Sequence, residues 1–133
     1  MESYFDNKAV VFLDMNDFHP NGQFKYDLKG KPMLIMVGGS FCGHCTRSAP
    51  AFNKFALDLK AEAIQRPNKK ARAVAAVIPV DGTQSQKDLG RFLGGLHKIS
   101  GIPVFMLFIA HGEFVRMVPE RKAEAFHEAV RSL

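Results

Sequence analysis

Cys42 and Cys45 are the two cysteines of the chain, and Gly43 and His44 separate them. On a helix, residues three positions apart lie on one face, so the two sulfur atoms can approach closely enough to form a disulfide. A thiol at a helix N-terminus ionises more readily because the helix dipole is positive there, and the thiolate is the nucleophile of disulfide exchange. The spacing therefore predicts redox chemistry, in which an exposed Cys42 attacks and a more buried Cys45 resolves the mixed disulfide.

The two residues between the cysteines could tune this chemistry. Gly43 has no side chain and allows the turn to pack tightly. His44 places an imidazole beside the Cys42 thiolate, where a cationic ring favours the reduced form. We therefore predict that Cys42, Cys45 and His44 are catalytic residues, and that a reversible disulfide joins Cys42 to Cys45.

Two other roles for the cysteine pair remain open. A tetrahedral zinc site takes four ligands, and two thiolates supply half of them. The other histidines lie far apart in the sequence, so zinc would need a second copy of the chain: His19, His97, His111 and His127. A purely structural disulfide is also open, although closing a two-residue loop adds little stability. We expect neither a metal nor a cofactor.

Composition limits the classes of protein to which the chain can belong. Of its 133 residues, 47% are hydrophobic and 23% are charged, which is typical of one globular domain and not of a disordered chain. The longest apolar run, 104–110, is much shorter than the roughly 20 residues of a membrane-spanning helix. Acidic residues precede the first apolar segment, unlike a secretory signal. We expect a single domain over 1–133, with an N-terminal extension over 1–8, in the cytoplasm and away from membranes.

The chain carries a net charge of +5, with 18 Lys and Arg against 13 Asp and Glu. Such a surplus can favour acidic partners or nucleic acid. The basic residues are scattered, however, and the densest run, 66–72, has the composition of a connecting loop. Neither a zinc-finger spacing nor an aromatic–glycine RNA-binding pattern accompanies it. We therefore expect no nucleic-acid partner.

The elements that must position the cysteines follow from the hydrophobic pattern. Continuous apolar runs, typical of strands buried on both faces, alternate with segments of helical periodicity. We predict strands over 9–13, 32–37, 73–80, 104–109 and 113–117, a short flanking strand over 24–28, and a hairpin turn over 110–112. We predict helices over 42–64 and 85–93, the second weakened at its end by Gly94 and Gly95, and a final helix that opens at 119–120. Pro50 predicts a kink in the first helix.

These residues and their order resemble the thioredoxin superfamily. Phe41-Cys42-Gly43-His44-Cys45 is similar to the active site of protein disulfide isomerase domains, in which tryptophan usually precedes the first cysteine. Pro50 falls on the family's helix-kinking proline, and Gly101-Ile102-Pro103 matches the segment whose proline is cis and faces the active site. The resemblance covers residues 10–133. It implies a thioredoxin fold of the α/β class, with a central mixed β-sheet flanked by helices.

The resemblance also implies a thiol–disulfide oxidoreductase that acts on polypeptide substrates with disulfides or thiols. It would work with a reductase or oxidase partner. Its substrate would lie against Phe41 and Gly43 on one side and against Ile102 and Pro103 on the other, with backbone groups of Ile102 free to pair with an extended peptide. The Gly-His dipeptide favours an oxidase or isomerase, whereas the missing export signal favours a reducing cytosol, so the direction stays open.

Three positions depart from the family pattern. Family members carry a buried acid six residues before the first cysteine, thought to move protons for the second thiol, and often a lysine facing it. Met36 and Val77 stand at these two positions. Replacing both partners by apolar groups leaves no lone buried charge, so we predict that both are core contacts and that the proton of Cys45 uses His44, water or substrate. Phe41 replaces the tryptophan, and 118–120 replaces a glycine of the substrate groove.

These departures leave a second hypothesis, a thioredoxin-fold binding or assembly module with vestigial redox activity. The lost acid and the altered 118–120 segment favour the module. The intact cysteine motif and Pro103 favour the enzyme.

Overall fold

The structure is a computed structural model that describes residues 4–68, 70–109 and 111–133. Its centre is a sheet of five strands: β1 (Val11–Phe12), β2 (Met33–Gly38), β3 (Val74–Pro79), β4 (Val104–Ile109) and β5 (Glu113–Met117). They stand side by side in the order β1-β3-β2-β4-β5. The first three in that order are parallel, whereas β4 runs antiparallel to β2 and β5 antiparallel to β4. The sheet is therefore mixed, as predicted.

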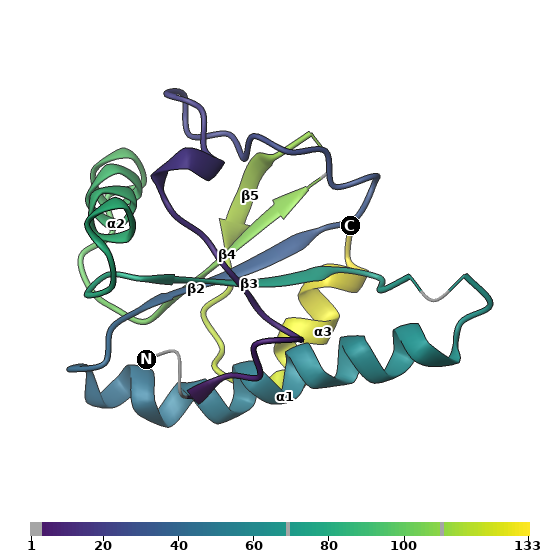
Figure 1. Ribbon diagram of the computed structural model, residues 1–133. Helices are drawn as coiled ribbons and strands as arrows, with labels where there is room; N and C mark the ends of the chain where they lie inside the picture. The colour runs from purple at the N-terminus through teal and green to yellow at the C-terminus, as the bar shows by residue number, and fades with distance from the viewer. Residues whose placement is uncertain (1–3, 69, 110) are drawn as a thin grey trace.

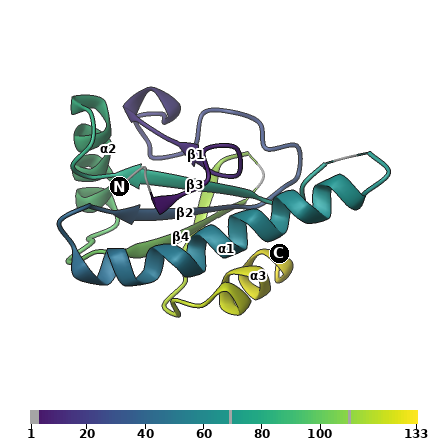
Figure 2. The same ribbon diagram turned by 60° about the horizontal axis from the view of Figure 1, so that its bottom comes forward.

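Helices cover both faces of this sheet (Figure 1). α1 (Gly43–Gln65) and α3 (Ala123–Arg131) pack together on one face, which Figure 2 turns toward the viewer. α2 (Gln84–Leu96) and a short 3₁₀ helix, η2 (Met15–Asp17), lie on the other face. This three-layer arrangement confirms the predicted α/β class with a central mixed sheet flanked by helices.

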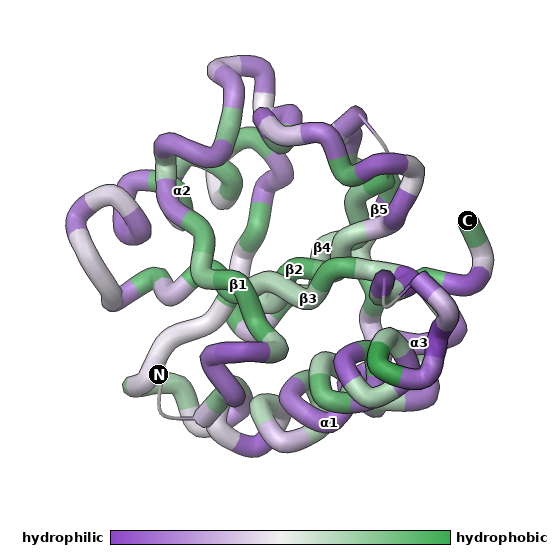
Figure 3. Tube along the Cα trace, turned by 45° about the vertical axis from the view of Figure 1, so that its right-hand side comes forward, coloured by the Kyte–Doolittle hydropathy of each residue, from purple (hydrophilic) through white to green (hydrophobic). Residues whose placement is uncertain are grey.

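Alternating side chains of the central strands build a separate core on each face. Leu34 and Met36 of β2 point to the α1 face, where they meet a cluster of phenylalanines: Phe52, Phe55, Phe105 and Phe126. Met33 and Ile35, the alternate residues of the same strand, point to the α2 face. Because both faces are covered, the strand is apolar throughout, and Figure 3 shows the central strands in green.

The chain order places the cysteine motif at one end of the sheet. β2 ends at Gly38, a short loop follows, and α1 begins at Gly43 with Cys42 as its N-cap residue. The helix continues through Pro50 to Gln65, in agreement with the predicted helix over 42–64. The kink expected at Pro50 stays a prediction.

Two predicted boundaries are wrong in the second half of the chain. The final helix begins at Ala123 and not at 119–120, because the N–H of Val118 donates to the carbonyl of Phe105 at 2.8 Å and keeps this segment tied to the sheet. α2 extends to Leu96, past both glycines, because the N–H of His97 still donates to the carbonyl of Leu93 at 2.9 Å. A single glycine weakens a helix by only about 1 kcal/mol, which packing can offset.

The predicted short strand over 24–28 does not form. Phe24 makes one antiparallel bridge with Phe18, and its N–H donates to the carbonyl of Gly112 at 2.8 Å. The segment is thus tied to the β4–β5 turn by one residue and to no full strand. Gly112 has φ +83° and no room for a side chain, because a Cβ there would collide with the backbone of Phe24.

Parts of three predictions lie outside the described residues: positions 1–3 of the extension over 1–8, Ala110 of the hairpin turn, and Lys69 of the basic run. Within the described part of the extension, Phe5 is buried and packs edge-to-face on Phe52 at 6.1 Å between ring centroids. The N–H of Asp6 donates to Oδ1 of Asn53 at 2.9 Å. These contacts fasten residues 5 and 6 to α1. The single-domain boundary itself stays a prediction.

Candidate active site

Cys42 stands at the N-cap of α1 with an extended backbone, so its sulfur faces the free amide groups of the first helical turn. The N–H of Cys45 donates to Sγ of Cys42 at 3.2 Å. The Cys42 thiol also donates to the carbonyl oxygen of Ile102, with 3.5 Å between the heavy atoms. Cys42 is half-buried, so its sulfur lies at the surface between the helix and the segment before β4.

The surroundings of Cys42 favour its thiolate. Burial by itself raises the pKa of the Cys42 thiol, but hydrogen bonds from the Cys45 side chain and from the N–H groups of Cys45 and His44 act in the opposite direction. The positive charge of Arg121 adds to them. Together they hold the pKa of Cys42 below its ordinary value, which increases the fraction of thiolate at neutral pH.

Cys45 has the opposite environment. Its side chain is fully buried among the apolar residues of the α1 face. This burial, together with the hydrogen bond to Cys42, raises the pKa of Cys45 to about 12. The first cysteine is thus half-buried and the second fully buried, which is the order of exposure that the spacing predicts.

His44 is exposed and contacts Arg47 one turn along α1. Nη2 of Arg47 lies 2.7 Å from Nδ1 of His44. Because arginine has donors and no acceptor, the Arg47 guanidinium is the donor in this contact. Arg47 therefore places a positive charge beside the His44 ring, and the tuning role of His44 stays a prediction. Gly43 allows this approach, since a Cβ there would lie 3.3 Å from Nη1 of Arg47.

The four predicted substrate-binding residues do not share one environment. The Ile102–Pro103 bond is cis, as the resemblance implied, and the Ile102 carbonyl lies against Cys42. Pro103 itself is buried. Phe41 exposes 73% of its surface beside the motif and covers Gly39 with its ring. Gly43 lies on the exposed side of the first helical turn. Ile102, Phe41 and Gly43 are therefore accessible around Cys42.

Met36 and Val77 are core contacts, as predicted. Both side chains are fully buried, and the two residues are register partners across β2 and β3. They belong to the same apolar cluster as Cys45. These two paired positions of the core are therefore apolar.

Two residues near the site were missed by sequence reasoning. Arg121 acts on both thiols from the loop between β5 and α3, next to the 118–120 segment that marked the groove. Extending that segment by one residue would have found it. Asp81 follows β3 and accepts from the backbone N–H of Ser40 at 3.1 Å and from its hydroxyl. The Ser40 hydroxyl bond, opposed by burial, holds the pKa of Asp81 below its usual range.

Other features of the described residues bear on metals and membranes. Among residues 4–68, 70–109 and 111–133, no group of three His, Cys, Asp or Glu side chains is arranged to hold a metal ion. In the same ranges, no helix combines the length and apolar character needed to cross a bilayer.

No family model matches the chain. A relative does: the chain is 31% identical over 112 residues to the protein of Invertebrate iridescent virus 6 that carries the name thioredoxin-like protein 453L. The match covers 81% of this chain and 80% of the viral protein. The chain belongs to the thioredoxin-like family. Family membership and the arrangement around Cys42 together indicate a redox-type function.

Solved thioredoxin-like structures share the fold. The short form of thioredoxin f from spinach chloroplast matches with a TM-score of 0.59 and 21% identity, over 92% of this chain and 91% of that one. The Trx4 domain of ERdj5 matches with a TM-score of 0.63 and 14% identity, over 93% and 94% of the two chains. These likenesses confirm the thioredoxin fold predicted from the sequence.

Proposed function

We propose that this thioredoxin-like protein is a thiol–disulfide oxidoreductase that acts on protein disulfides through Cys42 and Cys45. One observation carries the proposal: an accessible sulfur with a lowered pKa accepts a hydrogen bond from a buried neighbour whose pKa is raised to about 12. Such a pair divides disulfide exchange between an attacking thiolate and a protected resolving thiol. The position of the Ile102 carbonyl beside Cys42 supports the docking of an extended client there.

In the reducing direction, the Cys42 thiolate attacks one sulfur atom of the client disulfide. The client S–S bond breaks as the new S–S bond forms, and the departing client sulfur takes up a proton. The product is a mixed disulfide between Cys42 and the client. Removing the negative charge from Cys42 also removes a cause of the raised pKa of Cys45, since the Cys42 charge raises it.

Cys45 completes the cycle. Its thiol loses a proton, its sulfur attacks Sγ of Cys42, and the second client thiol leaves. The client has then gained two electrons and two protons, and the protein holds a Cys42–Cys45 disulfide. Because Met36 and Val77 are apolar, the proton of Cys45 must pass to water, to His44 or to the departing client sulfur. The reverse sequence oxidises a client dithiol, so the partner that resets the pair is a reductase or an oxidase accordingly.

The reduction potential of the Cys42–Cys45 pair tests this proposal. Pure protein is equilibrated with defined ratios of reduced and oxidised glutathione, and free thiols are trapped and counted. A reduction potential of about −180 mV would assign the disulfide-forming or isomerising direction that the Gly-His dipeptide favours. A potential of about −270 mV would assign a reductase. The proposal is wrong if no disulfide forms at any ratio.

The burial of Met36 and Val77 favours a second candidate, a thioredoxin-fold binding or assembly module. The core offers no buried carboxylate at Met36 to carry protons for Cys45, so turnover would be slow. A Cys42→Ser, Cys45→Ser double variant separates the two functions, because it keeps the fold and loses every redox step. If the biological role survives in the variant, the module is the function and the redox activity is incidental.

A further inference from the structure

We propose that the surface around Cys42 selects clients whose reacting disulfide is flanked by carboxylates, with Arg47 and Arg121 as the specificity-determining residues. This inference rests on the proposed function, because it concerns which disulfides the Cys42 thiolate attacks most rapidly.

Arg47 places a guanidinium directly over the motif. Its Nη2 lies 2.7 Å from Nδ1 of His44, and its Nη1 would lie 3.3 Å from a Cβ on Gly43. The two terminal nitrogens of the exposed Arg47 side chain therefore lie beside Gly43 and His44, the residues between the cysteines. The contact with His44 uses one of the five N–H donors of the guanidinium, and the others remain available to an anion.

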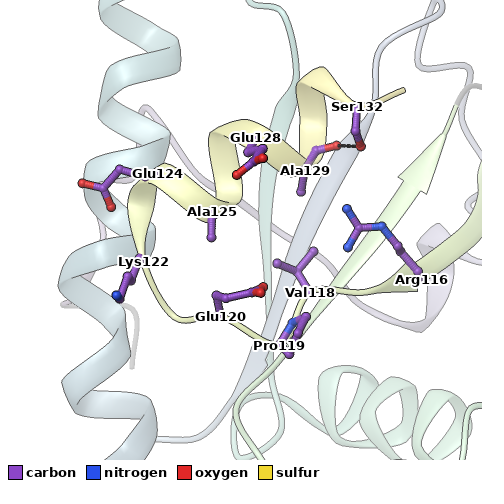
Figure 4. Close-up of a pocket in the computed structure, with 10 residues that line it drawn as sticks. All are labelled: Arg116, Val118, Pro119, Glu120, Lys122, Glu124, Ala125, Glu128, Ala129 and Ser132. Atoms are coloured by element: carbon purple, nitrogen blue, oxygen red, sulfur yellow. Dashed lines mark hydrogen bonds between the residues drawn. The ribbon is translucent and has the colours of Figure 1, made fainter.

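Arg121 approaches the cysteines from a different element. It lies in the loop that leaves β5, and its charge acts on Cys42 and on Cys45 alike. The preceding residue, Glu120, is acidic, but its side chain lines a separate groove of about 560 Å³ between this loop, Arg116 and α3 (Figure 4). Glu124 and Glu128 line that same groove. These three carboxylates thus lie along the α3 groove, whereas the charge of Arg121 acts on the thiols.

The segments that meet at Cys42 are otherwise poor in acid. α1 has no acidic residue in its first turn, and the first acid after Cys42 in the sequence is Asp58. Asp81 reaches the loop before Cys42, where it is bonded to the N–H and hydroxyl of Ser40. The charges that act on this part of the surface are therefore mainly positive, with Arg47 beside the motif and Arg121 acting on the thiols.

An extended client would meet these charges at defined places. The sulfur of Cys42 lies between the first turn of α1 and the Ile102 carbonyl. Residues beside the client cysteine would pass Arg47 on one side and the Arg121 loop on the other. Charges that are complementary across an interface mainly raise the association rate, and salt screens them over about 8 Å at physiological ionic strength. The selection should therefore be kinetic and sensitive to salt.

The test uses three peptides that carry the same mixed disulfide and the same leaving thiol, with Glu, Gln or Lys at the flanking positions. The second-order rate of attack by the reduced protein is measured at low and high salt. We expect the Glu peptide to react about five- to tenfold faster than the Lys peptide at low salt, with the Gln peptide between them. The ratio should fall toward one at about 0.5 M salt.

A double variant, Arg47→Gln with Arg121→Gln, assigns the preference to these residues. Its thiolate is also altered, but the ratio of Glu to Lys rates within one variant cancels that change. We expect the ratio to fall close to one. It should keep its original value in the control Arg131→Gln, which removes one positive charge in the last turn of α3.

The outcomes separate the two proposals. If all three peptides react at one rate, or the Lys peptide reacts fastest, the preference is wrong while the oxidoreductase stands. A ratio that survives the double variant also overturns the assignment to Arg47 and Arg121. If none of the peptides reacts while free cysteine in the same buffer does, the oxidoreductase is wrong, and the client preference is wrong with it.

Discussion

Near the start of α1, Arg47 contacts His44, and the charge of Arg121 acts on a thiol that is half exposed to solvent. Along the second half of the same helix, three side chains of α1 form a network with His127 of α3 and with Arg72, which precedes β3. The three are Lys54, Asp58 and Glu62. There Nε2 of His127 lies 2.8 Å from Oδ2 of Asp58, and Arg72 donates to Glu62 at 2.6 Å. In the network, each charged side chain has a partner of opposite charge. At the site, the positive charges of Arg47 and Arg121 remain available to an incoming client.

The difference shows what each end of the helix does. In the network, Arg72 also approaches Nδ1 of His127 at 3.5 Å, so the imidazole ring lies between a donor and an acceptor and fastens α3 to α1. At the site, the charge of Arg121 adds to the hydrogen bonds that lower the pKa of Cys42, and the side chains of Arg47 and Arg121 are exposed. Binding surfaces need groups whose partners are missing until a client arrives, whereas stability needs groups whose partners are present.

The largest expected effect on stability comes from placing an unpaired charge in the core beneath the site. Met36→Asp places a carboxylate at a fully buried position that faces Val77 across the sheet. We expect the free energy of unfolding to fall by about 3–5 kcal/mol, because the charge has no partner there. Urea unfolding followed by circular dichroism measures the loss.

Two variants control this experiment. Met36→Leu keeps the site apolar and should cost less than about 1.5 kcal/mol. Met36→Asp combined with Val77→Lys supplies a partner and should recover part of the loss. Equal stability of the Asp and Leu variants would contradict the apolar account of this position.

Breaking the network should have the next largest effect. His127→Ala removes the hydrogen bond to Asp58 and the packing of the ring on Phe55, whose centroids are 4.9 Å apart. We expect a loss of about 2–3 kcal/mol in the free energy of unfolding. The alkylation rate of Cys42 should stay unchanged, because the site lies at the other end of α1.

The pH dependence of stability sharpens this prediction. Burial raises the pKa of Asp58, but the bonds from His127 and Lys54 outweigh it and hold that pKa below its usual range. A lowered carboxyl pKa stabilises the fold above about pH 4 and loses this contribution as the pH falls through the folded value. Below that range, the difference in stability between the wild type and His127→Ala should shrink. A constant difference across the acid range would argue that ring packing alone accounts for the loss.

At the site, Arg121→Gln should raise the pKa of Cys42. The thiolate is the reactive form, so reactivity is lost as the pH falls through the pKa of Cys42, and the variant should lose it at a higher pH than the wild type. The rate of alkylation by iodoacetamide against pH measures the shift, with Arg131→Gln as the charge-matched control. Identical profiles for Arg121→Gln and the wild type would remove Arg121 from the account of this thiolate.

The smallest effect should come from the solvent-facing edge of the network. Lys54 donates to Asp58 at 3.0 Å, but its side chain is 65% exposed. Lys54→Ala should therefore change the free energy of unfolding by no more than about 0.5 kcal/mol, as is usual for exposed ion pairs one helical turn apart. A loss as large as that of His127→Ala would show that the network acts as one unit.

The sequence pattern was sufficient wherever one local signal determined the structure. The run of apolar residues predicted β4 over 104–109 to the residue. The cysteine spacing at a helix start predicted that Cys42 is more exposed than Cys45. The pairing of Met36 with Val77 followed from the family pattern, which places two opposed groups there.

The failures share a different cause, since each depended on a distant partner. The helix start at Ala123 is delayed because Val118 bonds to Phe105 in β4, and no signal near 119–120 reports this. Residues 24–28 have strand-like composition, but Phe24 is held by one bond to Gly112 at the far hairpin. Arg121 acts on the thiols although 76 residues separate it from Cys45 in the sequence. A single sequence carries local preferences more clearly than such long-range contacts.

The length of α1 has a consequence for how the protein could change. With 23 residues, the helix is roughly 35 Å long, and a charge is screened over about 8 Å at physiological ionic strength. Asp58 lies 16 residues from Cys42, or roughly 24 Å along the helix, which is about three screening lengths, so charges at the two places affect each other little. Substitutions in the network can therefore change the stability of the protein without changing the reactivity of the cysteine pair, and substitutions at the site can do the reverse. A more heat-resistant form could be engineered around His127 while the redox potential of the cysteine pair stays where it is.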